Sequence, residues 1–249
     1  MGQLSAQNIG VSFDGRQIIK DVSLHLNEGE IVSLLGVSGG GKTTIFNCLA
    51  GLLVPDTGKV FSDDTDITGK PGKISYMMQK DLLLPHYTVL DNACLGLLIK
   101  GKSKKESRAA AQPLFETFGL AGTEKKYPHQ LSGGMRQRVA LLRTYLASDG
   151  VALLDEPFSA LDAITKHTMH TWYLQVMEKI RLSTLFVTHD TEEAVLLSDR
   201  VYILGGNPGT ITDEIQVTLP GKKEDRDPSD PDFQSFVTLL QQKTAINIT

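Results

Sequence analysis

A glycine-rich loop at residues 36–43 constrains the fold of this chain more than any other feature of its sequence. The loop reads GVSGGGKT, which fits the pattern G-x-x-x-x-G-K-[ST]. It follows a mostly apolar run of strand length, Ile31–Leu35, and precedes apolar residues at helical spacing that begin at Lys42. A strand, such a loop and a helix in this order surround phosphate oxygens with backbone N–H groups at the positive end of a helix dipole. The sequence therefore predicts a nucleotide-phosphate site.

Each residue type in this loop serves a different purpose. The glycines let successive backbone N–H groups turn inward, the amine of Lys42 would reach the β and γ phosphates, and the hydroxyl of Thr43 would hold Mg²⁺. A chance match to the pattern is the alternative, but a strand and a helix on either side of the loop make it far less frequent. The predicted phosphate-binding residues are Gly36, Val37, Ser38, Gly39, Gly40, Gly41, Lys42, Thr43 and Thr44.

Strand and helix patterns alternate along most of the chain. Leu4–Phe13 and Gln17–Leu26 read as two strands joined at the turn Asp14-Gly15. Further apolar runs of strand length alternate with helical stretches near 162–180 and 190–198, and they lie at 151–154, 184–187 and 201–204. Such alternation predicts an α/β fold with a parallel sheet and right-handed connections.

Residues 81–150 differ from the rest because helical patterns replace the strand runs. Two segments there, Thr88–Asp91 and Ser103–Glu106, have the spacing of helix capping boxes. The charged, proline-containing segment 222–232 reads as a surface loop before one last helix. We therefore expect a single domain over 1–249, with a core at about 1–80 and 151–220, an inserted helical subdomain at about 81–150, and a C-terminal loop and helix at about 221–249.

Two strands of the predicted sheet end in residues that can act on a phosphate. The run at 151–154 leads to Asp155 and Glu156, and the run at 184–187 leads to His189. The carboxyl ends of parallel strands face the crevice in which ligands bind. Asp155 is thus expected to serve Mg²⁺, and Glu156 to polarise a water molecule as general base. A strand-end acid that only caps a turn is the alternative, and without the glycine loop it would be the better interpretation.

The other histidines and the two cysteines show no site pattern. His167 and His170 share a helix face at a spacing of i, i+3, but no third metal ligand is visible, so we interpret that face as solvated. Cys48 and Cys94 match no ligand spacing and are expected to be buried thiols. Three more histidines stand in no such context, His25, His86 and His129.

Composition excludes several classes of partner. With 25 Lys and Arg against 29 Asp and Glu, the net charge of −4 leaves no global basic field for a nucleic acid or an anionic membrane surface. The strongest apolar stretch, Ile31–Val37, is too short to cross a bilayer as a helix. Residues 1–10 lack the pattern of a secretion signal. From these observations we expect a cytosolic chain.

A last segment, 131–138 (LSGGMRQR), makes the likeness to a known family specific. Its residues Ser132, Gly133 and Gly134 stand at the start of a helical pattern and offer a further anion-binding surface. With this segment, the sequence closely resembles the ATP-binding subunits of ABC transporters. The resemblance covers nearly the whole chain and rests on motifs in that family's order, namely Phe13, 36–43, Gln79, 131–135, Asp155-Glu156, 159–162 and His189.

The resemblance implies a fold and two cofactors. The fold is a P-loop NTPase core of the α/β class, a mixed sheet with antiparallel strands at the N-terminus and a parallel central sheet, with an inserted α-helical subdomain. The cofactors are ATP and Mg²⁺. The catalytic residues would be Glu156, His189, Gln79 and Lys42, and the metal ligands would be Thr43, Gln79 and Asp155.

The resemblance also implies how nucleotide and partner copy are held. Phe13 would stack on adenine, at a position where the family more often has tyrosine. Gln79 would meet Mg²⁺ or the attacking water and act as a hinge to the helical subdomain. Two copies would pack head to tail, with Asp162 at their interface, so that the loop of one and the other's Ser132, Gly133 and Gly134 enclose each ATP.

Two positions depart from the family's pattern. Met135 stands where many members have glutamine, which changes the side chain but not the backbone cradle of 132–134. Gly40 replaces a bulkier loop residue that is common in the family, and glycine is expected to be harmless there.

Within the family, four segments look most like the importers of nitrate, sulfonate and taurine, a group that includes importers of pyrimidine precursors of thiamine: 131–138, 188–194, 197–201 and 207–211. The implied partners are an integral membrane permease and, through it, a solute-binding protein. The chain would then be a peripheral subunit on the cytoplasmic side of the cell membrane. The apolar stretch 81–85 either faces the permease or packs in the core, and the sequence favours neither.

Two other functions were weighed against transport. Relatives that use the same ATP sandwich in DNA maintenance or translation carry a long coiled coil after the glutamine or two tandem cassettes, whereas only 51 residues separate Gln79 from Leu131 here. A P-loop kinase of a small metabolite would leave the segment at 131–134 unexplained. We therefore expect no nucleic-acid partner and predict an ATP-hydrolysing subunit of an import system.

Overall fold

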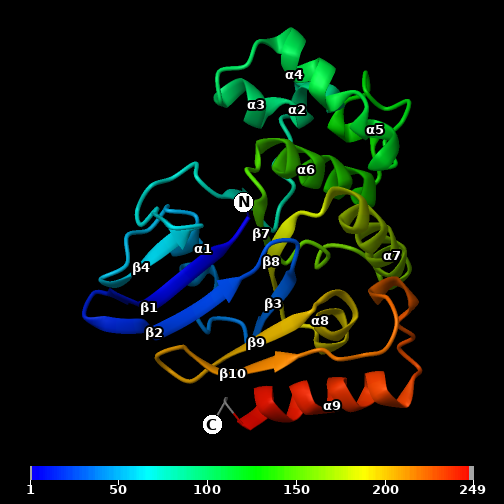
Figure 1. Cartoon of the computed structure of the whole chain (residues 1–249). Coiled ribbons are helices and arrows are strands. Elements are labelled where there is room, and N and C mark those ends of the chain that lie inside the picture. The colour runs from blue at the N-terminus through cyan, green and yellow to red at the C-terminus, as the bar shows by residue number, and fades with distance from the viewer. Residues whose placement is uncertain (1, 247–249) are drawn as a thin grey trace.

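The computed structural model describes residues 2–246, and in this part of the chain the strands form two sheets (Figure 1). The antiparallel sheet has the order β2-β1-β4-β5. Its strands are β1 (Leu4–Phe13), β2 (Arg16–Leu26), β4 (Thr57–Ser62) and β5 (Thr65–Asp66). Asp14 and Gly15 join the first two strands with φ of 50° and 76°, the backbone that a tight hairpin requires at both turn positions. The hairpin predicted from the sequence is thus confirmed.

The parallel sheet carries the ends of the strands that were expected to form the site. Its order is β10-β9-β3-β8-β7-β6, parallel from β9 to β6 and antiparallel only between β10 and β9. All residues of three of its strands are buried, as expected where both faces of a sheet are covered. The strands are β3 (Ile31–Gly36), β6 (Ser75–Met77), β7 (Val151–Asp155), β8 (Ser183–Thr188), β9 (Arg200–Gly205) and β10 (Thr210–Gln216).

The parallel sheet confirms the fold class predicted from the sequence. Two details were not foreseen. The N-terminal antiparallel strands form a sheet of their own, and β10 adds an antiparallel edge to the parallel sheet. The residues of β10 alternate only between half-buried and exposed, so its sequence lacks the apolar run by which the central strands were found.

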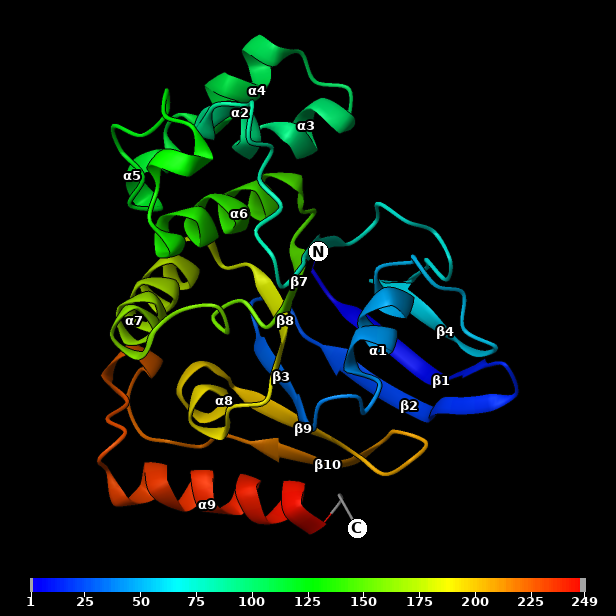
Figure 2. The same cartoon turned by 180° about the vertical axis from the view of Figure 1, so that it is seen from behind.

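Helices cover the parallel sheet from both sides. Helix α1 (Lys42–Leu49) packs between the two sheets through Ile45, Phe46 and Leu49, and its core joins residues of β1 to β4. The opposite side is covered by α7 (Ala163–Ile180), while α8 (Thr191–Leu197) and α9 (Pro231–Ile246) pack near β9, as Figure 2 shows. None of the helices among residues 2–246 is long and apolar enough to cross a membrane.

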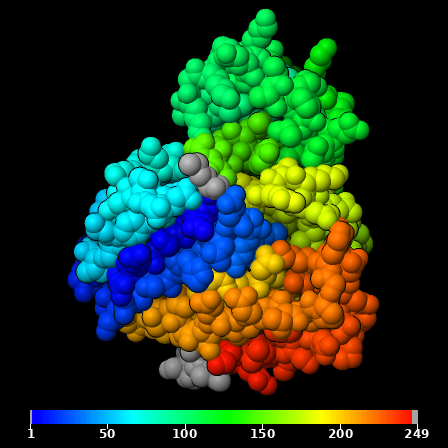
Figure 3. Space-filling view, in the orientation of Figure 1, coloured from blue at the N-terminus to red at the C-terminus, as the bar shows by residue number. Residues whose placement is uncertain are grey.

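The helices between β6 and β7 gather into a lobe above the sheets, which we call the helical lobe, and Figure 3 shows it projecting from the body of the molecule. Its last helix contacts β6 and so joins the lobe to the parallel sheet. The lobe consists of α2 (Val89–Ala93), α3 (Leu95–Ile99), α4 (Lys104–Ala111), α5 (Leu114–Thr117), η1 (Pro128–Gln130) and α6 (Gly133–Ala147).

One of the two capping boxes predicted in this lobe is confirmed. Ser103 and Glu106 cap α4 reciprocally, side chain to backbone in both directions. At the start of α2, the Thr88 hydroxyl accepts the N–H of Asp91, but the Asp91 carboxylate binds the Arg108 guanidinium instead of turning back. The second box was therefore wrong, because two guanidinium N–H groups at 2.9 Å outcompete a single backbone donor.

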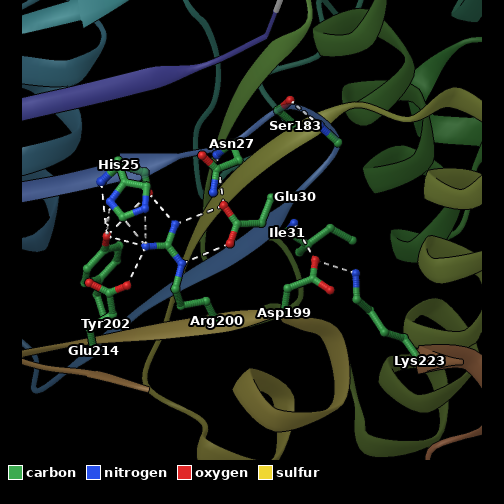
Figure 4. Close-up of polar contacts among 11 residues, drawn as sticks. His25, Asn27, Glu30, Ile31, Ser183, Asp199, Arg200, Tyr202, Glu214 and Lys223 are labelled. Atoms are coloured by element: carbon green, nitrogen blue, oxygen red, sulfur yellow. Dashed lines mark hydrogen bonds and ion pairs between the residues drawn. The ribbon is translucent and has the colours of Figure 1, made fainter. Parts of the chain in front are cut away.

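Arg200, the first residue of β9, joins the two sheets through its polar contacts (Figure 4). Its guanidinium is 1% exposed and donates two hydrogen bonds of 2.9 Å to Glu30 and one of 2.8 Å to Glu214. It also donates a hydrogen bond of 2.6 Å to the hydroxyl of Tyr202, and its Nη1 lies 2.9 Å from Nε2 of His25 on β2. Burial opposes the charge of Arg200, but the two carboxylates outweigh it and raise the pKa. The cation is thus held where β2, β9 and β10 meet.

Candidate functional site

The glycine-rich loop connects β3 to α1 and requires glycine at its two ends. A side chain at Gly36 would place its Cβ 2.7 Å from the carbonyl oxygen of Leu204 on the neighbouring strand. Gly41 has φ of 99°, a left-handed backbone, and a Cβ there would lie 2.6 Å from Ile19 Cγ2. These two glycines therefore let the loop turn tightly against β2 and β9 before the helix begins.

The side chain of Lys42 folds back into this loop. Its ammonium donates hydrogen bonds of 2.7 Å to the carbonyl oxygens of Gly36 and Val37, and only 6% of the residue is exposed. Burial lowers the pKa of Lys42, while the negative charges of Glu156 and Asp155 oppose that shift. The amine is thus held inside the loop, where oxyanions of a phosphate can replace the two carbonyls as acceptors.

Asp155 ends β7 at the same edge of the sheet. Its carboxylate accepts a hydrogen bond of 3.2 Å from the hydroxyl of Tyr76 on β6. Burial raises the pKa of Asp155, and the Tyr76 hydrogen bond acts in the other direction. Tyr76 was not identified from the sequence. Its contact with Asp155 depends on the pairing of β6 with β7, which places Tyr76 opposite Leu153 and which no local pattern in the sequence shows.

Glu156 turns away from the strand and meets two of the other predicted residues. Its φ is 45°, a left-handed backbone that is uncommon outside glycine. Gln79 Nε2 donates a hydrogen bond of 3.1 Å to Glu156 Oε2, and His189 Nδ1 lies 3.2 Å from Glu156 Oε1. Gln79 also donates 3.3 Å to Ser159 Oγ, a contact that sequence reasoning did not foresee. Two predicted side chains, Gln79 and His189, therefore converge on the carboxylate of Glu156.

A cavity of about 410 Å³ brings the loop and these carboxylates together. The sequence-predicted residues in its wall are Ser38, Gly39, Gly41, Lys42, Thr43, Thr44, Gln79, Asp155 and Glu156. Ile18 and Val187 complete the wall and were not predicted. The volume is in the range of small-molecule sites, and the wall combines one cation, two acids and a glycine-rich turn. Such a wall suits a polyphosphate accompanied by a metal ion.

The donors present fit Mg²⁺. Thr43, Gln79 and Asp155 supply a hydroxyl, an amide and a carboxylate in the wall of the same cavity. Mg²⁺ in nucleotide sites takes one or two protein oxygens, with phosphates and water as the remaining ligands. Among residues 2–246 there is no group of three or more His, Cys, Asp or Glu side chains that could hold a metal ion.

The segment at 132–134 lies outside this cavity. Ser132 is exposed and caps α6, where its hydroxyl accepts the N–H of Met135 at 3.3 Å. Gly133 instead borders another cavity, of about 730 Å³, whose wall also includes Gln79, Glu156 and His189. Phe13, at the end of β1, is 48% exposed and lies apart from the phosphate loop cavity as well. A single chain therefore does not bring its two predicted anion-binding segments together.

Asp162 has a local partner that sequence reasoning missed. It is exposed and caps α7. Its carboxylate accepts a hydrogen bond of 3.0 Å from the backbone N–H of Thr165 and one of 2.6 Å from the hydroxyl of the same residue. The Thr165 hydroxyl lowers the pKa of Asp162, with the backbone N–H acting in the same direction. An acid three residues before a threonine, at the start of a helical pattern, was the available signal.

A polar network behind His189 ties α8 to α7. Lys166 on α7 binds Asp190 at 2.6 Å and Glu193 at 3.3 Å, and His170 Nε2 lies 2.9 Å from Glu193 Oε1. The hydroxyl of Thr188, next to His189 in the chain, donates to Glu193 as well. The interpretation of a solvated face was thus wrong for His170, which is 7% exposed, because that face of α7 packs on α8. His167 is exposed as expected.

The remaining predictions on single side chains can be placed directly. Cys48 and Cys94 are buried free thiols, as predicted, and burial raises their pKa values to about 12 and about 11. The apolar stretch after Gln79 divides between its two interpretations. Leu83 is buried in the core, whereas Leu82 and Leu84 are exposed.

The sequence of this chain is similar to those of known proteins. A model of the family described as ABC transporter matches residues 19–159. The formylaminopyrimidine import ATP-binding protein ThiZ of Halalkalibacterium halodurans is 48% identical over 80% of this chain and 78% of its own length. The nitrate import ATP-binding protein NrtD of Synechocystis is 40% identical over 83% and 77%, respectively.

The fold is similar to solved structures as well. A dimeric ATP-binding cassette, MJ0796, in a post-hydrolysis state bound to ADP and Pi, matches with a TM-score of 0.73. It is 28% identical in sequence, and the match covers 87% of this chain and 99% of that one. The likeness therefore extends over sheets, helical lobe and phosphate loop together.

Proposed function

Because this chain belongs to the ABC transporter family, we propose that it binds ATP with Mg²⁺ and hydrolyses the nucleotide to power import of a small solute through a separate permease. The observation that carries this proposal is the meeting of Lys42, Asp155 and Glu156 in the wall of one cavity. The relatives named above are import ATP-binding proteins, which favours transport over a role on nucleic acid.

In this proposal each residue around the cavity has a defined task. Lys42 and the loop N–H groups hold the phosphates. Glu156 accepts the proton of the attacking water, while Gln79 and His189 orient its two carboxylate oxygens. Thr43, Asp155 and Gln79 would hold Mg²⁺, which would neutralise charge on the phosphates. Tyr76 keeps the Asp155 carboxylate in place for that purpose.

The exposed segments support a head-to-tail dimer. Ser132 is exposed and Gly133 half-buried at the start of α6, while Gly134 is buried, so this helix start would present Ser132, Gly133 and backbone N–H groups to the ATP bound at the partner's loop, with the exposed Asp162 at the interface. Phe13 is exposed and would stack on adenine. The dimeric state of the cassette MJ0796 supports this arrangement.

The proposal also covers the division of the chain, its membrane partners and its solute. We keep the core at about 1–80 and 151–220, the helical subdomain at about 81–150 and the C-terminal segment at about 221–249. Leu82 and Leu84 would contact the permease, and a solute-binding protein would act through that permease. The subunit would then be peripheral, on the cytoplasmic side of the membrane. The names of the two relatives support nitrate or a pyrimidine as the solute, and the resemblance described above adds a sulfonate or taurine as alternatives.

Replacement of the general base tests the proposal. Glu156→Gln removes the proton acceptor but keeps the shape and the hydrogen bond to Gln79, so phosphate release from ATP should fall by about 10² to 10⁴ while ATP binding persists. The matched control is Glu116→Gln, on an exposed face of the helical lobe. Turnover of Glu156→Gln close to that of the control would contradict the role of Glu156.

A further inference from the structure

A cavity of about 660 Å³ opens at the edge of the parallel sheet opposite the phosphate loop. Ile31, at the start of β3, and Asp199, just before β9, form its inner wall. The end of α7 and the segment between β10 and α9, which includes η2 (Lys223–Asp225), form the outer wall, and they run side by side in Figure 1. The phosphate loop and the residues proposed to act on ATP do not line this cavity.

The wall of this cavity is apolar on one side. Six aliphatic or thioether side chains from the sheet, from α7 and from the strand end of β10 contribute to it, which are Ile31, Leu174, Met177, Leu182, Val217 and Leu219. Five of them are buried within the chain, and Leu219 is half-buried. An apolar group of a ligand therefore has a surface to cover.

Most of the charges in the wall neutralise one another. Lys222 binds Glu178 at 2.8 Å and Glu224 at 3.4 Å. Lys223 binds Asp199 at 2.6 Å, and Figure 4 shows the lysine reaching across to that carboxylate. These pairs leave little net charge on their side of the cavity.

Arg226 differs from these lysines because its partners are neutral. Its Nη1 donates to the carbonyl oxygens of Val195, Leu196 and Ser198 at 2.6, 3.2 and 2.8 Å. Its Nε is buried and has no acceptor in the part of the chain that the structure describes. Burial lowers the pKa of Arg226, and Asp199 opposes that shift. Nη2 makes no hydrogen bond among residues 2–246 and is not one of the buried unpaired atoms, so it is the guanidinium nitrogen that remains for a ligand.

We propose that this cavity binds a small organic carboxylate, with its carboxylate accepting a hydrogen bond from Nη2 of Arg226 and its apolar body on the aliphatic wall. Arg181, at the rim, has no side-chain partner among residues 2–246 and adds a second positive charge. A single negative charge fits better than a phosphate dianion because both lysines of the wall are already paired with carboxylates and Glu28 adds a further negative charge to the wall.

A titration of the full chain followed by ¹⁹F NMR tests this proposal, with 4-fluorophenylacetate as the probe. We expect saturable binding with a Kd on the order of 1 mM. The neutral 4-fluorophenylacetamide should bind at least about tenfold more weakly, because it cannot form an ion pair with the guanidinium of Arg226. Absence of saturation with the acid, or equal binding of the amide, would overturn the proposal.

Variants locate the probe. Arg226→Lys keeps the charge but loses the planar guanidinium, so the affinity should fall at least about fivefold. Leu219→Trp fills the cavity without touching Arg226 and should weaken binding by about tenfold or more, which gives a second answer if Arg226→Lys fails to fold. Unchanged affinity in a folded Arg226→Lys or in Leu219→Trp would overturn the proposal.

Two controls separate this site from other anion sites. Lys105→Gln removes one exposed positive charge on the helical lobe and should leave the affinity for the probe unchanged. Lys42→Ala removes the cation of the phosphate loop and should also leave it unchanged. A loss of probe binding in Lys42→Ala would place the probe at the nucleotide site and overturn the proposal, whatever the outcome for ATP hydrolysis.

Discussion

Two helices of this chain begin at glycine-rich segments, and the two beginnings are built differently. At the start of α1, Gly41 offers no side-chain cap, so the first N–H groups of the helix are left for another acceptor. At the start of α6, the hydroxyl of Ser132 accepts the N–H of Met135. The first start is open to an anion, whereas the second has already satisfied one of its donors.

Their surroundings differ in the same sense. The start of α1 shares a cavity with Asp155 and Glu156, which reach it from β7 of the same chain. Through Gly133, the start of α6 borders another cavity, whose wall includes Glu156 but neither Asp155 nor the phosphate loop, and Ser132 is exposed. Two segments with the same chemistry toward anions thus form one nearly complete site and one half-site. The difference teaches that a glycine-rich helix start becomes a site only through what the rest of the fold, or a partner, places opposite to it.

Removal of the loop cation should have the largest effect on this comparison. Lys42→Ala deletes two or more charge-assisted hydrogen bonds to phosphate, so the affinity for ATP should fall by about 3 kcal/mol, or roughly 100-fold. Calorimetric titration with ATP and Mg²⁺ measures it, with Lys20→Ala, exposed on β2, as the control. An affinity equal to that of the control would remove the phosphate loop from the site.

A bulky charge at the other helix start should act only between copies. Ser132→Arg is expected to reduce ATP hydrolysis by about tenfold or more while the monomer keeps its ATP affinity, because the partner's nucleotide is the one it touches. Phosphate release and calorimetry on the same sample check both halves, beside Ser235→Arg on α9. If Ser132→Arg weakened ATP binding by the monomer as strongly as Lys42→Ala does, the distinction between the two helix starts would fail.

The ion pair behind His189 should contribute less than either anion-binding segment. Lys166→Met breaks the 2.6 Å pair with Asp190, which is partly exposed, so the free energy of unfolding should fall by about 1 kcal/mol at neutral pH. Urea denaturation measures the loss. Lys59→Met, whose pair with Asp66 is more exposed, is the control and should change stability by less than about 0.5 kcal/mol.

The same pair predicts a pH window for that loss. Burial opposes the ionisation of Asp190, but Lys166 and the backbone outweigh it and lower the pKa, so the contribution is present above the ordinary value of 3.8 and disappears as the pH falls through the lowered pKa. The pKa of Lys166 is raised, so its contribution is lost only as the pH rises beyond 10.5 through the raised value. A difference between wild type and Lys166→Met that persisted unchanged in acid would show that packing, not charge, holds α7 to α8.

Deletion of the cap should have the smallest effect. Ser132→Ala removes a hydrogen bond of 3.3 Å at the start of α6, so the free energy of unfolding should fall by about 0.5 kcal/mol. Thermal denaturation of the monomer at high dilution, with and without ATP, measures it, and ATP should stabilise the monomeric variant and the monomeric wild type equally. A larger loss in the presence of ATP would mean that Ser132 contacts the nucleotide bound to its own chain.

Most of the features that could be predicted from the sequence depend on residues that lie close together in the chain. The phosphate loop, the turn at Asp14-Gly15 and the cap at Ser103 each depend on residues a few positions apart, so their patterns are legible before the chain folds. Glu156 and His189 were found because parallel strands bring their carboxyl ends to one edge. The fold class and most of the phosphate-side wall followed from these patterns.

The contacts that could not be predicted join residues that are far apart in the sequence. Tyr76 reaches Asp155 from 79 residues away, and Arg200 collects partners that lie between 2 and 175 residues from it. For His170, the spacing gave the helix face but not its neighbour, and burial against α8 reversed the interpretation. No periodicity in a single sequence reports which surfaces will meet, so these contacts had no signal that pattern reading could use.

The backbone of Glu156 carries a further consequence. A left-handed conformation at a glutamate is a standing penalty, which glycine would relieve and which the chain retains at the residue that bears the proposed general base. Thermostability and turnover therefore make opposite demands on this one position. A laboratory selection for heat resistance alone would favour Glu156→Gly. The variants that it recovered would be stable proteins that lack the proposed general base.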